Sequence, residues 1–548
     1  MTENKNLEEF KKELIVNIDG RVQNKIIEQA NADLLKKLIN QAETETEAIN
    51  IAALGTTYKR TGFHFDKRLE KISNDIKYKL KDENLSFVND ASRQTHELII
   101  GDNYDALQNL LITYKGKIDV IYIDPPYGKD SMGEFAKTNY DNSITRDNLL
   151  SMLYSRLLLA KRLLSEDGVI FCSIDDKNQA YVKCLFDEVF GEENLLGTLV
   201  WQSATDNNVR QITTEHEYIH AFAKIKSNQD KWLIDSEKAQ MIKRKYEELK
   251  ESLGTDITNE TIQIELRKWI VENEKELKGV AHYNCVDEKG VFTANTNSSN
   301  TKPGGYMFDI IHPVTKKVCT KPDYGWRWTE DTFLKYASEG NVLWGKDETT
   351  QPHIKKRIET VTEQLKGIYY EDGRVATKLL ESIFGNKLMF SNPKPITFIK
   401  RLIEFCSRKN SIILDFFAGS GTTGQAVMEL NRQDDGDRMF ILCQLNEKTK
   451  DNPNGIAYDV TTKRLKRIMS GECYDGSKDF PWLKDNEPYM DNLNVYKIGK
   501  VSKTEHQTGE TAFDKIDETC YGLPKFEKLT DKIEWVCQNF ENATKMEE

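Results

Sequence analysis

Two short motifs of the chain contain residue types that could do chemistry. The first is Asp124-Pro125-Pro126-Tyr127, which directly follows the apolar residues 119–123. A carboxylate in that position can accept a hydrogen bond from an amino group, and a rigid Pro-Pro turn fixes a backbone carbonyl that can accept another. An aromatic ring beside them can stack on a planar ring. The motif therefore suits the orientation of an exocyclic amine, although Asp and Pro are also ordinary residues of a turn after a strand.

The second motif is the stretch DFFAGSGTT at residues 415–423, which follows the apolar run SIIL. Its glycines allow a turn tight enough for backbone amides to approach a ligand closely. Gly419, Gly421 and Gly424 also satisfy GxGxxG, the pattern of dinucleotide-binding loops. A dinucleotide-dependent oxidoreductase is therefore an alternative from another class, but it leaves the first motif without a role. The GK[ST] ending of a phosphate-binding loop is absent.

Short apolar runs alternate with stretches of helical periodicity around the first motif. The pattern predicts strands at ELIIGDN, at residues 119–123 and at EDGVIFCSID, a further strand beginning at GTLVW, and helices over residues 146–164 and 178–190. Such alternation is typical of an α/β domain with a mainly parallel sheet. Ligands bind at the carboxyl ends of the strands in these sheets, so the four residues of the first motif should border the crevice.

The alternation breaks down in the middle of the chain and returns near residue 386. We therefore expect one domain written in two halves, residues 97–201 and 386–470, around an insert of residues 202–385. Residues 1–96 are polar and helical in pattern, which fits either a docking or dimerisation segment or a helical lead-in packed on the main domain. Residues 471–548 form an acidic C-terminal segment, with 10 Lys and Arg against 17 Asp and Glu.

Together the two motifs resemble those of the amino-methyltransferase family of DNA enzymes. DPPY comes first, as in the β-class order, in which the adenosylmethionine loop lies nearer the C-terminus. Further stretches resemble the modification (Mod) subunits of type III restriction–modification systems, over residues 97–447: IIGDNYDAL, LSMLYSRLLLAKRLLSEDGVIFCSIDD, EHEYIHAFAK, FSNPKPITFIKRLI and FILCQLNE. The resemblance implies a Rossmann-like methyltransferase sheet with circularly permuted motif order and an inserted target-recognition domain.

The resemblance also implies an activity. It points to methyl transfer from S-adenosylmethionine to N6 of adenine in double-stranded DNA, with N4 of cytosine as the alternative on the same scaffold. A non-catalytic DNA reader should have lost Asp124 or Tyr127, and both are present. No metal ion is required, because the methyl sulfonium is already activated. The implied partners are double-stranded DNA, a second copy of the chain and a restriction (helicase–nuclease) subunit.

Individual site residues follow from the same resemblance. Asp124 and the Pro125 carbonyl would hold the target amine, with Pro126 completing the turn, and Tyr127 would stack on the flipped base. Asp102 would meet the adenine amino group of the cofactor. Family members often carry an acidic residue for the cofactor ribose after the FILC strand, where this chain has Gln444 with Asn446 near by. The residues implied to hold the methionine end or to pack over the cofactor are Asp415, Phe416, Ala418, Gly419, Gly421, Thr422, Asn392 and Lys394.

DNA contacts are expected in the insert. Trp326, Arg327 and Trp328 follow three lysines, and such a mixture of aromatic and basic residues can meet phosphates and unstacked bases. The alternative is that the tryptophans belong to the core of a small domain and the lysines are solvated. The net charge of −11 does not exclude DNA binding, because a local basic face can coexist with an acidic remainder.

Composition limits the remaining classes. Nine cysteines are scattered without a CxxC pair, which fits reduced thiols better than a disulfide framework or a zinc site. No apolar run approaches the roughly 20 residues that span a bilayer, and no signal peptide is evident. We therefore expect a cytoplasmic protein without a membrane segment or a bound metal.

Overall fold

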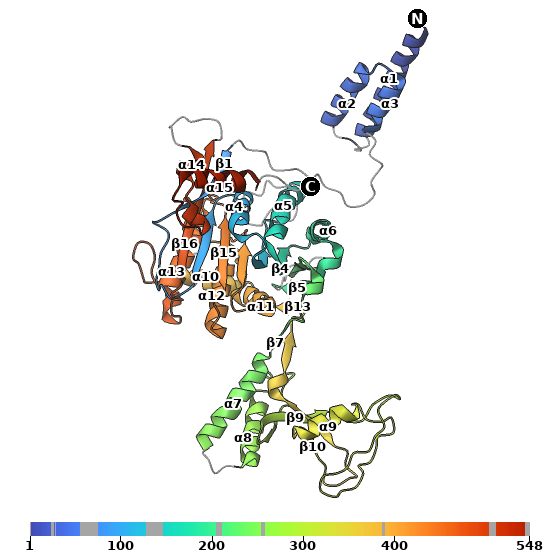
Figure 1. The fold of residues 1–548 in the computed structure, drawn as a ribbon, viewed down its shortest axis with the longest axis vertical. Coiled ribbons are helices and arrows are strands. Elements are labelled where there is room, and N and C mark those ends of the chain that lie inside the picture. Colours follow the sequence, from blue (N-terminus) through green and yellow to red (C-terminus); the bar gives the residue numbers. More distant parts are fainter. Residues whose placement is uncertain are drawn as a thin grey trace.

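The computed structural model of this 548-residue chain describes residues 2–23, 27, 29–54, 75–127, 146–203, 211–253, 258–296, 298–385, 389–502 and 511–542. Figure 1 shows a group of N-terminal helices, a central domain and a lower body formed by the middle of the chain. The N-terminal helices are α1 (Thr2–Gln23), α2 (Gln29–Gln41) and α3 (Glu45–Leu54). They pack around a small core that includes Ile18, Leu35 and Ile39.

A ten-stranded sheet, in the order β1-β16-β2-β15-β14-β3-β4-β6-β5-β13, forms the centre of the molecule. Its strands from β16 to β4 all run parallel. Strand β6 lies antiparallel between β4 and β5, and β1 lies antiparallel to β16. The strand bounds are β1 (Asp75–Lys81), β2 (Thr95–Ile100), β3 (Ile118–Ile123), β4 (Leu164–Ile174), β5 (Leu195–Gln202), β6 (His216–Ala223), β13 (Ile368–Tyr370), β14 (Ile412–Asp415), β15 (Met439–Gln444) and β16 (Asn492–Ser502).

Helices cover both faces of this sheet, because successive side chains of a strand point to opposite faces and both faces here are apolar. In β3, for example, Val120 and Tyr122 belong to one core and Ile121 and Ile123 to the other. The first core contains α10 (Arg374–Ile383), α11 (Ile396–Cys406), α12 (Thr422–Asp434) and α13 (Lys463–Ser470). The second contains α4 (Asn103–Tyr114), α5 (Arg146–Leu163), α6 (Gln179–Phe190) and α15 (Leu529–Asn542); α14 (Ala512–Lys515) lies beside α15. The predicted α/β sheet is confirmed.

The winding of the chain reverses between two neighbouring strands of the sheet. After β14 the chain passes through α12 to β15 on one side, and after β3 it passes through α5 to β4 on the other side. The two strands are paired in parallel, with Ile413 opposite Val120. A point where the winding direction changes leaves a crevice at the carboxyl ends of the strands, and this crevice is where open α/β sheets bind ligands.

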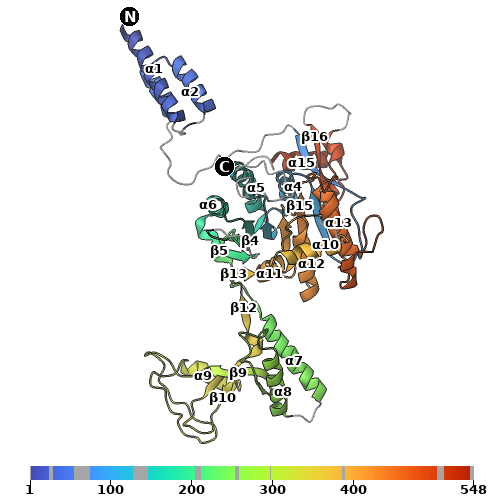
Figure 2. The ribbon, with the colours of Figure 1, turned by 180° about the vertical axis from the view of Figure 1, so that it is seen from behind.

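The lower body spans fewer residues than the insert expected from the sequence. It begins at β7 (Leu233–Asp235) and ends at β12 (Thr362–Gln364), and these two strands pair to form its neck (Figures 1 and 2). Residues 211–232 and 365–385 contain β6, β13 and α10, which belong to the central domain. The expected boundaries of 202 and 385 were wrong. In the described part of the chain, strand β6 follows β5 without an intervening helix and pairs antiparallel with β4 and β5, so the alternation of strands and helices ends before the central domain does.

The neck carries two helices and a small sheet. Helices α7 (Glu237–Leu253) and α8 (Asn259–Glu272) pack on each other. The four-stranded sheet has the order β10-β11-β9-β8 and lies beside α9 (Glu330–Ser338). Its strands are β8 (Cys285–Asp287), β9 (Gly290–Thr296), β10 (Val342–Leu343) and β11 (His353–Arg357). We call residues 233–364 the insert body.

The two terminal segments also differ from expectation. Residues 75–96 contain β1, and the C-terminal residues contain β16, which inserts between β1 and β2. In this pairing Asp75 lies opposite Ser502, more than 400 residues away. Such distant pairing leaves no local pattern, so the acidic C-terminal segment was not recognised as part of the central sheet. No helix among the described residues is long and apolar enough to cross a membrane.

Candidate active site

The two motifs lie side by side at one edge of the sheet. Strands β2, β15, β14 and β3 are consecutive neighbours, and at or directly after their carboxyl ends stand Asp102, Gln444, Asp415 and Asp124. The sheet therefore brings together four of the residues that the sequence analysis singled out, although they are separated by up to 342 positions. This edge is the reversal point described above, where a ligand is expected.

The DPPY turn belongs to a cluster of four polar side chains. The Tyr127 hydroxyl lies 2.9 Å from Asp124 Oδ1 and 2.8 Å from Glu217 Oε2. The Lys394 ammonium lies 3.2 Å from Asp124 Oδ1, donates to the Tyr127 hydroxyl oxygen at 2.9 Å and forms a short ion pair with Glu217. These contacts fix both the carboxylate that would receive an amine and the ring that would stack on a base.

Lys394 reaches this cluster from the NPKP stretch before α11. It is buried, and its ammonium lies 5.3 Å from the centre of the Trp201 ring as well as 5.3 Å from that of Tyr127. The sequence analysis expected Lys394 to pack over the cofactor; in the structure it contacts these four side chains, and its contact with the cofactor stays a prediction. Asn392, from the same stretch, is exposed and has a left-handed backbone with φ of 52°.

Glu217 is a site residue that the sequence analysis missed. It is the second residue of the antiparallel strand β6, on the far side of β4 from the DPPY turn. Its side chain is 24% exposed, compared with 8% for Lys394. The available signal was its place within the EHEYIHAFAK stretch that resembles the family.

Burial controls the protonation of the cluster. Burial raises the pKa of Asp124 above its ordinary value, and the nearby Glu217 carboxylate adds to this effect while Lys394 opposes it. Burial also raises the pKa of Tyr127 well above its ordinary value. For Lys394, burial alone would lower the pKa, but the carboxylates of Asp124 and Glu217 outweigh it and raise the pKa. The lysine therefore stays charged between two carboxylates.

The glycine-rich loop forms a tight turn between β14 and α12. Gly419 has φ of 53° and Gly421 has φ of 82°, a backbone region that side chains with a Cβ rarely adopt. The Gly421 amide donates to the Ala418 carbonyl at 2.8 Å, which closes the turn. The Thr461 hydroxyl, from the π-helical turn Ala457–Thr462, donates to the Gly419 carbonyl at 2.7 Å. The loop is therefore held in one conformation before any ligand arrives.

Asp415 supports this loop from beneath. It is buried, and its carboxylate accepts hydrogen bonds from the Phe417 amide at 3.0 Å and the Thr423 hydroxyl at 2.5 Å. Burial raises the pKa of Asp415 to about 7. The role expected for Asp415 was to hold the methionine end of the cofactor. In the structure, both oxygens of its carboxylate accept hydrogen bonds from groups of the loop and the start of α12.

Arg464 is a second support that the sequence analysis missed. This buried side chain of α13 donates to the Ser420 hydroxyl at 2.9 Å, to the Thr422 hydroxyl at 3.0 Å and to Gln425 at 2.7 Å. Burial lowers the pKa of Arg464 to about 10. Thr422 was expected to touch the cofactor. In the structure its hydroxyl accepts a hydrogen bond from the buried Arg464.

A third network fixes the loop after β2. Asp102 caps the start of α4 by accepting from the Tyr104 amide at 2.8 Å, and it also receives Arg156 Nη2 at 3.1 Å. Arg156 is buried and bonds Asn103 through its Nε, and Asn103 in turn donates to the Phe416 carbonyl at 2.9 Å. Asp102 nevertheless keeps 45% of its side chain exposed at the edge, so it can still receive a ligand.

Gln444 and Asn446, the two residues considered for the cofactor ribose, have different environments at the end of β15. Gln444 is buried, and its side-chain oxygen accepts from the Gly419 amide at 2.7 Å while its amide donates to the Leu445 carbonyl at 2.9 Å. Both ends of the Gln444 amide bind the protein, and its contact with the cofactor stays a prediction. Asn446 donates to the Asn454 carbonyl at 2.8 Å, but its buried Oδ1 atom has no hydrogen-bond partner among the described residues.

The orphaned Asn446 oxygen tests whether the edge fits the expected cofactor. A buried acceptor without a partner costs about 1–3 kcal/mol, and a ligand hydroxyl would recover this free energy once the Asn446 amide turns away from Gly455, against which it packs. Together with the half-exposed Asp102 and the pre-formed glycine loop, Asn446 provides polar groups spaced along one edge. The residues present fit S-adenosylmethionine, which when bound supplies an electrophilic methyl group.

The three residues expected to touch DNA have different environments in the insert body. Trp326 is 1% exposed, belongs to a core with Ile310 and Phe333, and donates from its ring to the Phe308 carbonyl at 3.0 Å. The prediction that Trp326 contacts DNA is wrong, because its ring is not accessible. Trp328 is half-buried and packs edge-on against Tyr336, while Arg327 is exposed.

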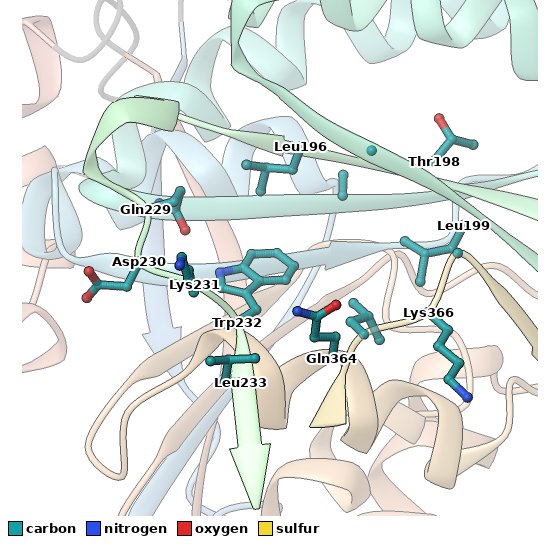
Figure 3. Close-up of a pocket in the computed structure, with 14 residues that line it drawn as sticks. Leu196, Thr198, Leu199, Gln229, Asp230, Lys231, Trp232, Leu233, Gln364 and Lys366 are labelled. Atoms are coloured by element: carbon teal, nitrogen blue, oxygen red, sulfur yellow. The ribbon is translucent and has the colours of Figure 1, made fainter. Parts of the chain in front are cut away.

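A cavity of about 460 Å³ lies where the neck joins the sheet (Figure 3). It is lined from β5, from residues 229–233 and from residues 364–367, with Trp232 and Leu199 among its apolar side chains. Trp232 also packs against Phe171 of β4. None of the residues of the two motifs lines this cavity, so it is not the active site.

Comparison with known proteins agrees with this site. Residues 118–454 match the DNA methylase family (N6_N4_Mtase), and residues 7–120 match a family of uncharacterised conserved proteins. The chain is 32% identical to the type III restriction-modification enzyme EcoP15I Mod subunit of Escherichia coli, covering 81% of this chain and 73% of that protein. It is 28% identical to the StyLTI Mod subunit of Salmonella typhimurium (74% of this chain, 60% of that protein) and 28% identical to the type II methyltransferase M.KpnI of Klebsiella pneumoniae (76% and 97%).

These matches confirm the resemblance found in the two motifs and exclude the oxidoreductase alternative. The matched region runs from the start of β3 to beyond the end of β15, and it includes both motifs together with Glu217, Lys394 and Asn446. The chain therefore belongs to the DNA methylase family and is an S-adenosylmethionine-dependent DNA methyltransferase.

Proposed function

We propose that this enzyme methylates N6 of adenine at a specific site in double-stranded DNA, as the modification component of a restriction–modification system. The observation that carries the proposal is the position of the DPPY turn beside the glycine loop, on neighbouring parallel strands. The Asp124 carboxylate and the turn carbonyl orient the amine, and Tyr127 stacks on a base taken out of the duplex. The same acceptors suit N4 of cytosine, so the preference for adenine rests on the likeness to Mod subunits.

Digestion of DNA to nucleosides tests the choice of base directly. The enzyme is expressed in cells that lack other DNA methyltransferases, beside an Asp124→Ala variant as control. Mass spectrometry should then find N6-methyladenine in DNA from cells with the wild-type enzyme and not in DNA from the control cells. N4-methylcytosine in place of N6-methyladenine would contradict the proposal. Single-molecule sequencing of the same DNA gives the recognition site.

The cofactor is assigned to the edge formed by β2, β15 and β14. We assign its ribose to Asn446, whose Oδ1 lacks a partner among the described residues, and its adenine amino group to Asp102. Asn446→Leu keeps the volume and removes the polar atoms. It should lower the affinity for S-adenosylmethionine roughly tenfold by calorimetry, whereas Asn454→Ala should leave the affinity within about twofold, because Asn454 contributes its backbone carbonyl to this contact.

The insert body is assigned the reading of the DNA sequence. Residues 298–328 carry five Lys and Arg (302, 316, 317, 321 and 327) against Asp309 and Asp323, in a chain whose net charge is −11. Tyr306, Met307 and Tyr324 of this segment are 50–65% exposed. Exposed aromatic and apolar side chains next to positive charge suit a partner with phosphates and base edges.

The backbone beneath these side chains is tightly pinned. Tyr306 and Trp326 exchange two backbone hydrogen bonds, of 2.9 and 2.7 Å. A Cβ at Gly305 would stand 2.3 Å from the Tyr324 carbonyl oxygen, so the two segments pack backbone against backbone. A backbone that is already fixed loses little further entropy on binding, so only the side chains have to be ordered. The double variant Tyr306→Ala, Met307→Ala should therefore weaken binding to cognate DNA by at least roughly tenfold in a fluorescence anisotropy titration.

Partner proteins are part of the proposal as well. The likeness to type III Mod subunits favours a helicase–nuclease restriction subunit, a second copy of the chain in the assembly, and work in the cytoplasm where the DNA lies. M.KpnI, of which 97% is matched, is a type II methyltransferase by name, so the length of the chain does not decide between the two types. ATP-dependent cleavage of unmethylated DNA, on adding a helicase–nuclease from the same genome, would support the type III assignment.

A further inference from the structure

The Tyr127 hydroxyl joins two carboxylates that face it from different elements. It lies 2.9 Å from Asp124 Oδ1 and 2.8 Å from Glu217 Oε2, and Lys394 donates to its oxygen at 2.9 Å. A tyrosine hydroxyl has one hydrogen, so it donates to one carboxylate at a time. Because both acceptors are within hydrogen-bond distance, the hydroxyl can take a proton from one carboxylate while it gives its own to the other.

The net charge of the cluster suits it to accept the one proton that the methylated amine must release. Two carboxylates and one ammonium give the cluster a net charge of −1, and methyl transfer to an exocyclic amine leaves one surplus positive charge on the amine nitrogen. Asp124, which faces the amine, is the first group that can take this proton. Burial raises the pKa of Asp124, which favours uptake of the proton.

Asp124 must release this proton before the next turnover. The enzyme needs an ionised Asp124 to orient the next amine, and a base stacked on Tyr127 would cover this carboxylate from solvent. Glu217 lies on the other side of the Tyr127 hydroxyl; its side chain is 24% exposed, close to the 27% of Asp124, but a base stacked on Tyr127 would face Asp124 and not Glu217. Lys394 contacts both carboxylates and stays charged, so it stabilises whichever of them is ionised.

We propose that Glu217 is the terminal proton acceptor of the methyl transfer and is reached through the Tyr127 hydroxyl. The bond from the methyl carbon to the donor sulfur breaks as the bond to the amine nitrogen forms. The amine nitrogen then gives a proton to Asp124; Asp124 passes it to the Tyr127 oxygen, while the Tyr127 hydrogen moves to Glu217 and from there to water. The inference rests on an exocyclic amine as acceptor and holds for adenine and cytosine alike.

Single-turnover kinetics on cognate DNA test this route. Glu217→Gln and Tyr127→Phe keep the shape of both side chains, and each should slow methyl transfer by about 10- to 100-fold, which reaches the lower end of the contribution that proton transfer makes in other enzymes. The double variant should be no slower than the slower single variant, because both substitutions interrupt one route. Glu215→Gln removes the same charge two residues away and is the matched control, expected to remain within about twofold of wild type.

Two further readouts separate proton transfer from a purely structural role. The fluorescence of 2-aminopurine at the target position reports extrusion of the base, and it should be unchanged in both single variants. Added formate should restore part of the rate of Glu217→Ala and none of the rate of Tyr127→Phe, because a small carboxylate can replace Glu217 but cannot replace the hydroxyl that connects it to Asp124.

Several results would overturn the inference. A Glu217→Gln enzyme within about twofold of the wild-type rate, additive losses in the double variant, or a loss of 2-aminopurine fluorescence that accounts for the slower rate would each do so. A wild-type enzyme that methylates neither base would instead refute the proposed function. The two failures are therefore distinguishable in the same set of assays.

Discussion

The catalytic edge and the insert body place their charged side chains in opposite environments. At the edge, Arg156, Lys394 and Arg464 are buried, and each is bonded to polar groups that the protein itself supplies. On residues 298–328 of the insert body, Lys302 and Arg327 are exposed beside half-exposed tyrosines. Methyl transfer needs one fixed geometry, whereas reading a DNA sequence needs groups that can reach the partner.

The comparison also indicates which changes each region tolerates. Removing one partner of a buried ion pair leaves a charge without compensation, which commonly costs about 3–5 kcal/mol. Substituting an exposed side chain removes the contacts with the partner and leaves the fold intact. Substitutions at the edge should therefore affect the chemistry, and substitutions on the insert surface should affect the choice of DNA.

The largest effect is expected for Asp124→Ala. In the proposed mechanism this carboxylate orients the amine and receives its proton, so its loss should slow methyl transfer by at least about 10³-fold while DNA affinity stays within a few-fold. Radioactive methyl transfer and fluorescence anisotropy measure the two quantities. Asp479→Ala, an exposed carboxylate outside both motifs and the insert body, is the control. Transfer by Asp124→Ala at near the wild-type rate would remove Asp124 from the mechanism.

Trp326→Ala tests the core of the insert body. The ring is fully buried, and such truncations typically cost about 3–5 kcal/mol, so we expect local unfolding of this body. Hydrogen exchange should increase over residues 298–354 and remain unchanged in the central sheet, and binding of S-adenosylmethionine should persist. Protection equal to wild type together with weaker DNA binding would mean that Trp326 contacts DNA after all.

Gly421→Val tests the glycine loop through its backbone. Gly421 has φ of 82°, and its Cβ would stand 3.4 Å from a Thr461 methyl group, so a β-branched residue strains the turn by about 1–3 kcal/mol. Affinity for S-adenosylmethionine should fall at least roughly tenfold by calorimetry.

Gly522→Val is the matched control for this strain. Gly522 has φ of 77°, lies far from the loop in the chain and has open space around its Cβ position. It should lower the melting temperature by a similar amount and keep the wild-type affinity. Equal affinities in both variants would contradict the assignment of the loop to the cofactor.

The smallest effect is expected for Arg327→Ala. If Arg327 contacts a base, discrimination at one position of the site should fall by about 1–3 kcal/mol, and if it contacts a phosphate, all sequences should be weakened alike. Competition binding with single-base variants of the site distinguishes the two, and Glu330→Ala is a nearby exposed control. Unchanged binding to every sequence would show that the exposed Arg327 faces away from DNA.

Local sequence patterns were sufficient to predict the central chemistry. The DPPY turn and the glycine loop each join one strand to the segment that follows it, so their residue types and neighbours are legible within about ten positions. The parallel sheet then places them together without further information, because the carboxyl ends of parallel strands share one edge. Asp124 and Tyr127 were found in this way.

Residues that act through distant contacts were not predictable in the same way. Glu217 meets Tyr127 across 90 positions, and Arg464 meets Ser420 across 44. Their residue types and spacing do not distinguish these side chains from solvated ones, and Glu217 stands out only by its place in the EHEYIHAFAK stretch that resembles the family. Trp326 was misread for a related reason, since alternating aromatic and basic residues do not reveal which ring turns inward. The insert boundaries were misplaced because β6 rejoins the sheet without a preceding helix.

An exchange of the insert body tests the division between chemistry and reading most directly. Residues 233–364 are replaced, at the paired neck strands β7 and β12, by the corresponding body of a related methyltransferase with a known site. Methylome sequencing should find methylation at the donor's site, on the same base atom as before and still dependent on Asp124. A folded chimera that methylates the original site would contradict the account and place recognition outside the insert body.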